Sequence, residues 1–192
     1  MPSSNNTVIR SMHDVGLSAW FGGALMGAIG VNGAAAEVDK PTERATIAST
    51  GWARWSPVAA GAIATHLIGG AGLLISQRRR VRSQPGAKAN TIAKTAITGA
   101  ALAATAYSGV LGAKIAASGD VPVEGATEPA PTTTPGVSSA QQQLRLLQWA
   151  IPLLTGALIV LGAQQGEQQR PLHGLRSVAR TAGKRGLGLI QA

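Results

Sequence analysis

Four long stretches of this sequence contain no Asp, Glu, Lys or Arg, and they constrain the fold more than any other feature. They cover residues 15–36, 56–76, 95–113 and 146–166, which are 22, 21, 19 and 21 residues long. A bilayer core of about 30 Å is crossed by about 20 helical residues rising about 1.5 Å each. A soluble amphipathic helix would instead carry charge every few residues on its wet face. The windows therefore predict an all-α, polytopic membrane protein with a bundle of four transmembrane helices.

The alternative is a soluble, alanine-rich four-helix bundle, because Ala and Gly are only weakly lipophilic. The third window favours this alternative most, since it holds Thr95, Thr98, Thr105, Tyr107 and Ser108. We extend the third helix to residues 95–118 and expect it to depend on its neighbours for stability. Only 13% of the chain is charged, against about 25% in typical globular proteins, which favours the membrane.

The basic residues between the windows predict the orientation in the membrane. Residues 77–94 carry six basic residues and no acid, whereas residues 119–145 carry three acids and no base before Arg145. Positive residues stay on the cytoplasmic side. We therefore expect both termini to be cytoplasmic, as residues 1–14 and 167–192, together with the 77–94 loop. Residues 37–55 and 119–145 are expected outside, with Trp52, Trp55 and Trp149 at the outer interface and Trp20 near the inner one.

The segments outside the windows are expected to differ in order. Residues 37–55 predict one short surface helix that begins at Pro41 and ends near Gly51, before Ser56 and Pro57 start the second membrane helix. Residues 119–145 predict an extended Pro/Thr-rich linker. The tail 167–192 fits either an amphipathic helix on the inner leaflet or a disordered basic tail.

The net charge of +9 is concentrated beside the windows and is not interleaved with aromatic residues. Anionic lipid of the cytoplasmic leaflet is therefore the expected partner, and nucleic acid is not. The residues expected to bind lipid headgroups are Arg78, Arg79, Arg80, Arg82, Arg176, Arg180 and Lys184.

Small residues recur at four-residue spacing inside the windows, which in a bilayer permits close helix packing. The expected packing positions are Gly23, Gly27, Gly61, Gly69, Ala96, Ala100, Ala104, Ser108, Gly112 and Ala116. We expect a tight bundle with small faces left over for other membrane subunits.

His66 lies at the midpoint of the second window, and an ionisable residue at that depth is a functional-site hypothesis by default. It would hold haem, quinone or a metal, with Tyr107 as a neighbour, or it would form a neutral hydrogen bond to the third helix. His13 is expected about 15 Å away along the membrane normal, by helical rise, and so not to share a ligand.

His13 is followed by the sequence Trp20-Phe21-Gly22-Gly23, which resembles the first helix of copper-resistance-D-like membrane proteins. The resemblance covers about 15 of 192 residues and implies a four-helix-type membrane domain, with metal traffic in which His13 is the matching position. The chain lacks Met- and His-rich segments that copper handling favours, so no copper function is carried over. We interpret His13 and Asp14 as an interfacial or capping pair.

The chain has no cysteine, nucleophile–base pair or phosphate loop, so we expect no enzyme activity and no thiolate metal site. Its 12 arginines against five lysines, with abundant Ala and Gly, are typical of high-GC bacteria such as actinobacteria. The leading hypothesis is a non-catalytic accessory or scaffolding subunit of a larger bacterial inner-membrane complex. The alternative is a small bundle that binds haem, quinone, metal or lipid around His66, and a pore is a third possibility.

Overall fold

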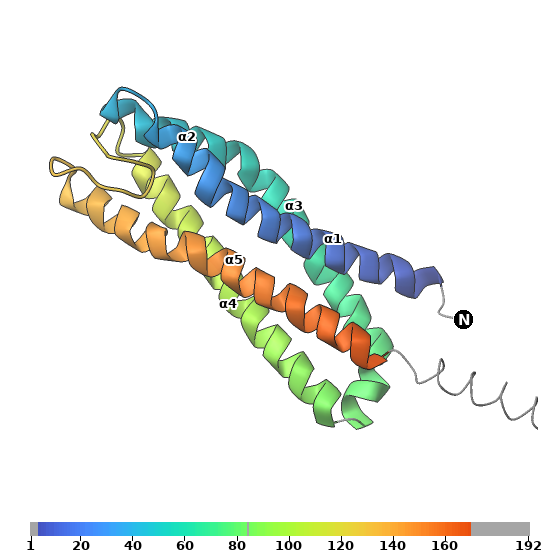
Figure 1. Ribbon diagram of the computed structural model, residues 1–192. Helices are drawn as coiled ribbons and strands as arrows, with labels where there is room; N and C mark the ends of the chain where they lie inside the picture. The colour runs from blue at the N-terminus through green and yellow to red at the C-terminus, as the bar shows by residue number, and fades with distance from the viewer. Residues whose placement is uncertain (1–3, 84, 170–192) are drawn as a thin grey trace, which may run out of the picture. The chain divides into compact units, whose positions relative to one another are not determined.

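The computed structural model describes residues 4–83 and 85–169, and within these ranges the chain is all-α with no strand (Figure 1). An isolated antiparallel bridge joins Val123 to Pro129. The helical elements are α1 (Ser4–Met26), the π-helical turn η1 (Gly27–Val31), α2 (Asn32–Ala36), α3 (Pro41–Ser83), α4 (Pro85–Ala116) and α5 (Pro135–Gln169). The all-α prediction is confirmed.

Within the described ranges, four helical stretches are long and apolar enough to cross a membrane. They are Asn6–Ala36, Pro41–Arg78, Gly86–Ala116 and Pro135–Gln164, with 31, 38, 31 and 30 residues. Each exceeds the roughly 20 residues that a hydrocarbon core requires. The chain is therefore a multi-pass membrane protein, and the side on which its termini lie stays a prediction.

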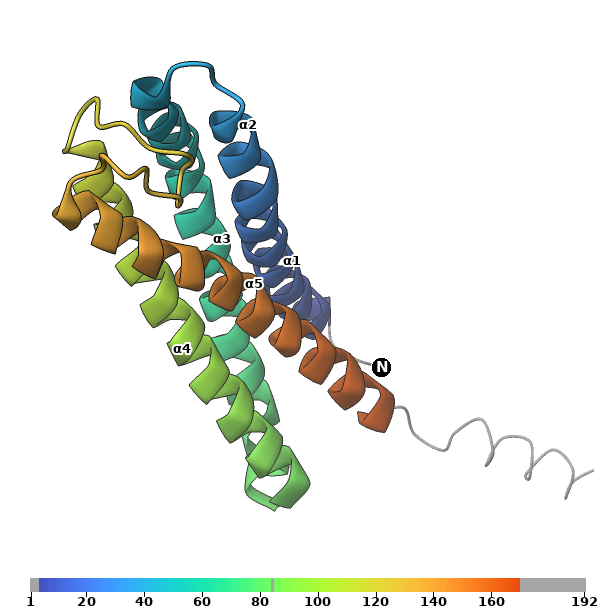
Figure 2. The same cartoon turned by 60° about the vertical axis from the view of Figure 1, so that its left-hand side comes forward.

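The chain divides into two compact units, Met1–Ile159 and Val160–Ala192. In the first unit α1 lies beside α3 in both views (Figures 1 and 2). One hydrophobic core gathers around Trp20 and Ala101, and a second gathers around Val123 and Ala140 at the end of the bundle near residues 117–134. The described part of the second unit is the end of α5, residues 160–169.

Glycines set the close approach between antiparallel α1 and α3. A Cβ atom on Gly16 would lie 2.5 Å from the carbonyl oxygen of Ala62, and one on Gly69 would overlap the backbone of His13. Only a residue without a side chain fits at either position. The two helices therefore pack backbone against backbone, as small residues permit in membrane bundles.

The same interface staggers the two charge-free windows. Gly23 of α1 lies against the indole of Trp55 and Gly27 lies against that of Trp52, so a Cβ atom at either glycine would overlap a ring. The middle of the first window therefore faces the start of the second window. Trp20, which we expected near the inner interface, is 2% exposed in the core of the bundle, and its depth in the membrane stays a prediction.

α3 is longer than the second window, and the connection before it is shorter than predicted. The helix begins at Pro41, as expected, but continues through Gly51, where we expected it to end. Gly51 serves packing, because a Cβ atom there would lie 2.8 Å from Cγ1 of Val31. Ser56 does not cap a new helix, since its hydroxyl donates to the carbonyl of Trp52 inside α3 at 2.8 Å.

Prolines mark the true helix starts, because Pro41, Pro85 and Pro135 each occupy the first position of their helix. α4 and α5 consequently begin at residues 85 and 135 rather than at 95 and 146. The Pro/Thr-rich connection is reduced to residues 117–134, which we name the 117–134 loop. The loop is folded, with Val123 0% and Thr127 1% exposed, so the expectation of an extended linker is wrong.

Candidate functional site: a cavity beneath a folded loop

A cavity of about 330 Å³ lies in the first unit between α1, α3, α4 and α5, and Ala126 of the 117–134 loop bounds it. Three of the chain's four tryptophans, Trp20, Trp52 and Trp55, line it. None of the lining residues is charged. An apolar cavity of about 150 Å³ suffices to bind benzene, so this cavity has room for a larger molecule.

The cavity exists because small residues form the wall supplied by α4, with Ile115 as the one large residue there. The small residues are Thr105, Ser108, Gly109, Gly112, Ala113 and Ala116. A Cβ atom on Gly112 would meet no atom within 4 Å. Part of the small-residue stripe that we expected to pack helices therefore leaves a space between them instead.

A chain of hydrogen-bonded side chains bounds the cavity. Trp52 Nε1–H donates to Asn32 Oδ1 at 2.9 Å, and Asn32 Nδ2–H donates to Gln148 Oε1. Gln148 Nε2–H donates to Thr127 Oγ1 at 3.2 Å, and the Thr127 hydroxyl donates to the Glu128 carboxylate at 2.9 Å. Asn32 and Gln148 are 7% and 9% exposed. The chain thus connects α2, α3, α5 and the 117–134 loop through buried, mostly uncharged groups.

The π-helical turn η1 explains how Asn32 comes to point inward from an apolar helix. The turn ends directly before Asn32, whose backbone N–H bonds to the carbonyls of Gly27 and Ile29. One inserted residue turns the following side chains by about 100°, since an α-helix has about 3.6 residues per turn. Single π turns of this kind are frequent at functional sites.

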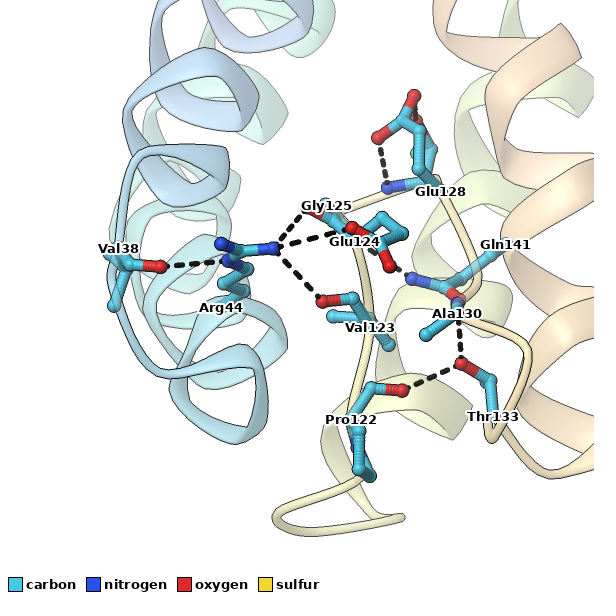
Figure 3. A network of polar contacts seen from close by, with 11 residues as sticks. Val38, Arg44, Pro122, Val123, Glu124, Gly125, Glu128, Ala130, Thr133 and Gln141 are labelled. Carbon is cyan, nitrogen blue, oxygen red and sulfur yellow. Dashed lines mark hydrogen bonds and ion pairs between the residues drawn. The ribbon is translucent and has the colours of Figure 1, made fainter.

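Arg44 of α3 fastens the 117–134 loop to the helices (Figure 3). Its Nε–H donates to the carbonyl of Val38 at 2.8 Å, and its Nη1–H donates to the carbonyl of Glu124 at 3.0 Å. The Glu124 carboxylate lies 3.7 Å from Nη1 and is exposed. On the neighbouring surface Lys40 Nζ donates to Glu43 at 2.9 Å, and this bond raises the pKa of Lys40 above its usual value.

Two further side chains hold the loop from within (Figure 3). Gln141 Nε2–H of α5 donates to the carbonyls of Gly125 and Ala126, at 2.9 and 3.2 Å. The Thr133 hydroxyl donates to the carbonyl of Pro122 at 2.6 Å. The loop is therefore held by side-chain hydrogen bonds to its backbone, and its Ala126 bounds one end of the cavity.

The two histidines His13 and His66 meet between α1 and α3. Their ring centroids are 4.1 Å apart with planes inclined by 20°. His13 Nδ1 lies 3.1 Å from the His66 carbonyl oxygen, and His66 Nδ1 lies 3.0 Å from the His13 carbonyl oxygen. Because a carbonyl only accepts, both Nδ1 atoms carry a hydrogen and donate it. The expected separation of about 15 Å is wrong, since it placed both windows at one depth and ignored their stagger.

This arrangement separates His66 from the cavity. His66 is 2% exposed, and the Trp20 ring meets it edge-on with a centroid distance of 6.2 Å. Trp20 also lines the cavity, and its Nε1–H donates to Thr105 Oγ1 at 3.1 Å. His66 bonds to α1, not to the third membrane helix as expected. Tyr107, the expected neighbour of His66, donates to Gln143 of α5 at 2.5 Å.

The predicted packing residues occupy different places. Gly23 of α1, Gly27 of η1 and Gly69 of α3 lie at the close contact with the facing helix, while a Cβ atom on Gly61 or Gly112 would meet nothing within 4 Å. Ala104 packs against the core that contains Trp20. The remaining members are exposed, as for Ala96 and Ala100, or line the cavity, as for Ser108 and Ala116.

The residues predicted to bind lipid headgroups are described only in part. Arg78 and Arg82 lie near the C-terminal end of α3. The side chains of Arg79 and Arg80, and the whole of Arg176, Arg180 and Lys184, lie outside the described residues.

Sequence reasoning missed the residues whose hydrogen bonds connect the helices and the 117–134 loop around the cavity, above all Asn32, Gln148 and Arg44. A signal was present for the two amides, because each is a strongly polar residue inside a charge-free membrane window, where such residues are costly and need a partner. Arg44 gave a weaker signal, as one base in a segment of mixed charge.

Among the described residues no group of three or more His, Cys, Asp or Glu side chains is placed to hold a metal ion. Comparison with models of protein families found no match, and the curated proteins and the solved structures gave none either. The similarity of the His13 segment to copper-resistance-D-like helices is thus not accompanied by a family match. The function is inferred from the geometry of the cavity.

Proposed function

We propose that this chain is a non-catalytic, multi-pass membrane protein that binds a lipidic molecule in the cavity between its helices. The supporting observation is the uncharged, partly open cavity of about 330 Å³, which is lined by three indoles and bounded by Ala126 of the folded loop. Ligand pockets commonly measure about 300–1,000 Å³ and are mostly apolar with a few placed polar groups. The proposal keeps the binding class considered from the sequence but moves the ligand from His66 to the cavity.

The charge distribution supports a place in the cytoplasmic membrane of a bacterium. With residues 77–94 and both termini inside, Arg78 and Arg82 would lie beside the anionic lipids of the inner leaflet. The 117–134 loop, which contains Asp120, Glu124 and Glu128, would then close the cavity on the outer side.

The test is to purify the protein from its native membranes in a gentle detergent and to identify extracted lipids by mass spectrometry. Gly112→Leu fills the cavity, because open space surrounds that position. Gly99→Leu is the matched control, since Gly99 lies on the same helix, also in open space, but does not line the cavity. We expect one lipid species in stoichiometric amount in the wild type and in Gly99→Leu, and its loss in Gly112→Leu. Equal lipid content in all three proteins would contradict the proposal.

A second candidate function, an accessory subunit of a larger membrane complex, is supported by the outward face of α4. This face exposes small residues, namely Ala96, Gly99, Ala103 and Ala106. α3 and α5 expose large side chains beside small ones, such as Ile68 at 62% and Leu153 at 72%, and α4 also exposes Ile92 and Val110. Lipid tails accommodate small and large apolar side chains alike, but a helix face made of small residues allows another helix to approach closely.

Affinity purification with mass spectrometry tests the accessory role. We expect a stoichiometric membrane partner that is lost when Gly99→Leu enlarges the α4 face. Gly61→Leu is the control, because Gly61 lies on α3 and is likewise surrounded by open space. A protein that elutes alone, or a partner that survives both substitutions, would count against docking on α4.

A further inference from the structure

The two histidines between α1 and α3 lie at a contact that has no spare room. A Cβ atom on Gly16 would lie 2.6 Å from the backbone nitrogen of His66, and one on Gly69 would overlap the backbone of His13. The two rings stack with their centroids 4.1 Å apart, and His66 is 2% exposed. A charge on the His66 ring therefore cannot gain a hydration shell unless the helices move apart.

The hydrogen bonds of the pair identify the atoms that can take up a proton. Each Nδ1–H donates to the backbone carbonyl of the other histidine, at 3.1 Å for His13 and 3.0 Å for His66. The lone pair of each neutral ring is therefore on Nε2. A proton that binds there from solvent leaves the Nδ1–H bond in place and adds a positive charge to the contact.

Two charged rings are not compatible with this stacking. Like charges that share a buried site strongly oppose the ionisation of the second group, as in paired carboxylates. The stacked pair therefore binds at most one proton, whereas two separated and hydrated histidines both bind one well below pH about 6.5. Acid consequently shifts the equilibrium toward separated rings, by about tenfold per pH unit for each additional proton.

The charged groups around the pair oppose a second proton as well. On α1, the exposed residues Arg10 and Asp14 lie near the rings, and on α4 Lys94 acts on both of them. Asp14 attracts a proton, while Arg10 and Lys94 repel it. α3 and α5 add no charge within their windows 56–76 and 146–166. Two cations thus stand against one anion.

Trp20 connects the pair to the cavity. Its ring meets His66 edge-on with a centroid distance of 6.2 Å, and its Nε1–H donates to Thr105 Oγ1 at 3.1 Å. The same indole lines the cavity and is 2% exposed. Separation of the two histidine rings would remove one of the contacts that hold this part of the cavity wall.

We propose that the pair of His13 and His66 is a pH switch between α1 and α3. In the neutral form the pair holds the two helices together. Uptake of protons at acidic pH separates the rings and loosens Trp20 in the cavity wall. The proton arrives at His13, the less buried ring, which lies on the cytoplasmic side in the predicted topology. The switch goes beyond the proposed lipid binding and does not depend on which molecule occupies the cavity.

Hydrogen exchange of the full-length wild-type protein in an uncharged detergent tests the switch. It is measured at pH 7.5 and at pH 5.5, on either side of the ordinary histidine pKa of about 6.5. After correction for the intrinsic effect of pH on exchange, we expect the protection of residues 9–20 to fall by about tenfold at the lower pH. The protection of residues 140–148, which hold the 117–134 loop, should not change.

Histidine variants show whether the pair is responsible. His66→Asn keeps a side-chain N–H near the position of Nδ1, cannot be charged, and leaves only the partly exposed His13 to titrate. We expect the fall in protection to shrink to about twofold or less, because the repulsion between two charged rings is gone. His173→Asn replaces the third histidine of the chain and is the control, which should behave like the wild type.

The outcomes that would overturn the switch are distinct from one another. Unchanged protection of residues 9–20 in the wild type overturns it whether or not the variants fold. A fall of undiminished size in His66→Asn, or in His13→Asn if the first variant does not fold, overturns the role of the pair. A fall confined to residues 9–14 overturns the connection to Trp20 and the cavity wall.

Discussion

Asn32 is the residue on which the polar boundary of the cavity depends. It accepts from Trp52 and donates to Gln148, so one amide connects α3 to α5. Both partners come from distant parts of the chain, and both are themselves partly or fully buried. Removing the amide would leave a donor and an acceptor unsatisfied at once.

We therefore predict that Asn32→Leu, which keeps the branched shape but removes the hydrogen bonds, lowers the free energy of unfolding by about 1–3 kcal/mol. Denaturant unfolding in detergent, followed by circular dichroism, measures it. Gln142→Leu, an exposed amide on α5, is the control and should change stability little. Equal stability of the two variants would show that the chain of bonds does not hold the helices.

A second prediction at this scale concerns two glycines of α1 that differ only in their surroundings. Gly16→Ala should lower stability by about 1–3 kcal/mol, because the new Cβ atom overlaps the backbone of α3 and forces the helices apart. Gly22→Ala meets no atom within 4 Å, and it should be neutral or stabilising by about 0.5–1 kcal/mol through helix propensity. Thermal unfolding of the two variants side by side decides the point; identical melting would refute the close contact.

The residues of the site were only partly predictable from the sequence. The charge-free windows contain Asn32 and Gln148, and intramembrane polar residues demand partners. Which amide meets which indole depends on the π turn η1 and on the helix stagger, and neither leaves a periodic signal. His66 stood out because it is ionisable. Its contact with His13 was not expected, because the depth of each histidine in the membrane was counted from the edge of its own charge-free window.

At the scale of elements, the existence of the four helices was predictable and their ends were not. Absence of charge marks the part of a helix that lipid surrounds, whereas the helix itself continues into charged segments, as α3 does through Arg44. Prolines at positions 41, 85 and 135 carried the missing information, since a proline fits the first position of a helix at little cost. The fold of the 117–134 loop was hidden, because its hydrogen bonds come from distant helices.

Arg44 provides the prediction at this scale. Arg44→Ala removes charge-assisted hydrogen bonds to loop and connection carbonyls, which contribute about 1.5–3 kcal/mol each. Hydrogen exchange of the amides in residues 117–134 should accelerate by at least tenfold, while exchange in the middle of α1 stays unchanged. Glu124→Gln removes only an exposed ion pair and should have almost no effect, as is usual for surface pairs. Equal exchange in both variants would mean that Arg44 does not fasten the loop.

At the scale of the whole molecule, the orientation in the membrane is testable because the chain has no cysteine of its own. Thr132→Cys and Lys88→Cys each introduce one exposed thiol, in the 117–134 loop and in the predicted cytoplasmic segment. We expect a membrane-impermeant maleimide to label Thr132→Cys on intact cells and Lys88→Cys only after permeabilisation, since basic residues stay inside. The reverse pattern would invert the topology, and with it the side on which the cavity is closed.

The stagger between α1 and α3 has a consequence for the surrounding bilayer. Because Gly23 faces Trp55, the half of the first window beyond it lies beside the part of α3 that carries Arg44 and Arg54. The charge-free stretches of the two helices therefore end at different positions along the membrane normal. The bilayer must become locally thicker beside one helix and locally thinner beside the other. Such mismatch costs fractions of a kcal/mol per ångström and is relieved by tilt. The contacts at Gly16 and Gly69 fix this stagger, and they thus influence the bilayer thickness at which the cost of hydrophobic mismatch is lowest.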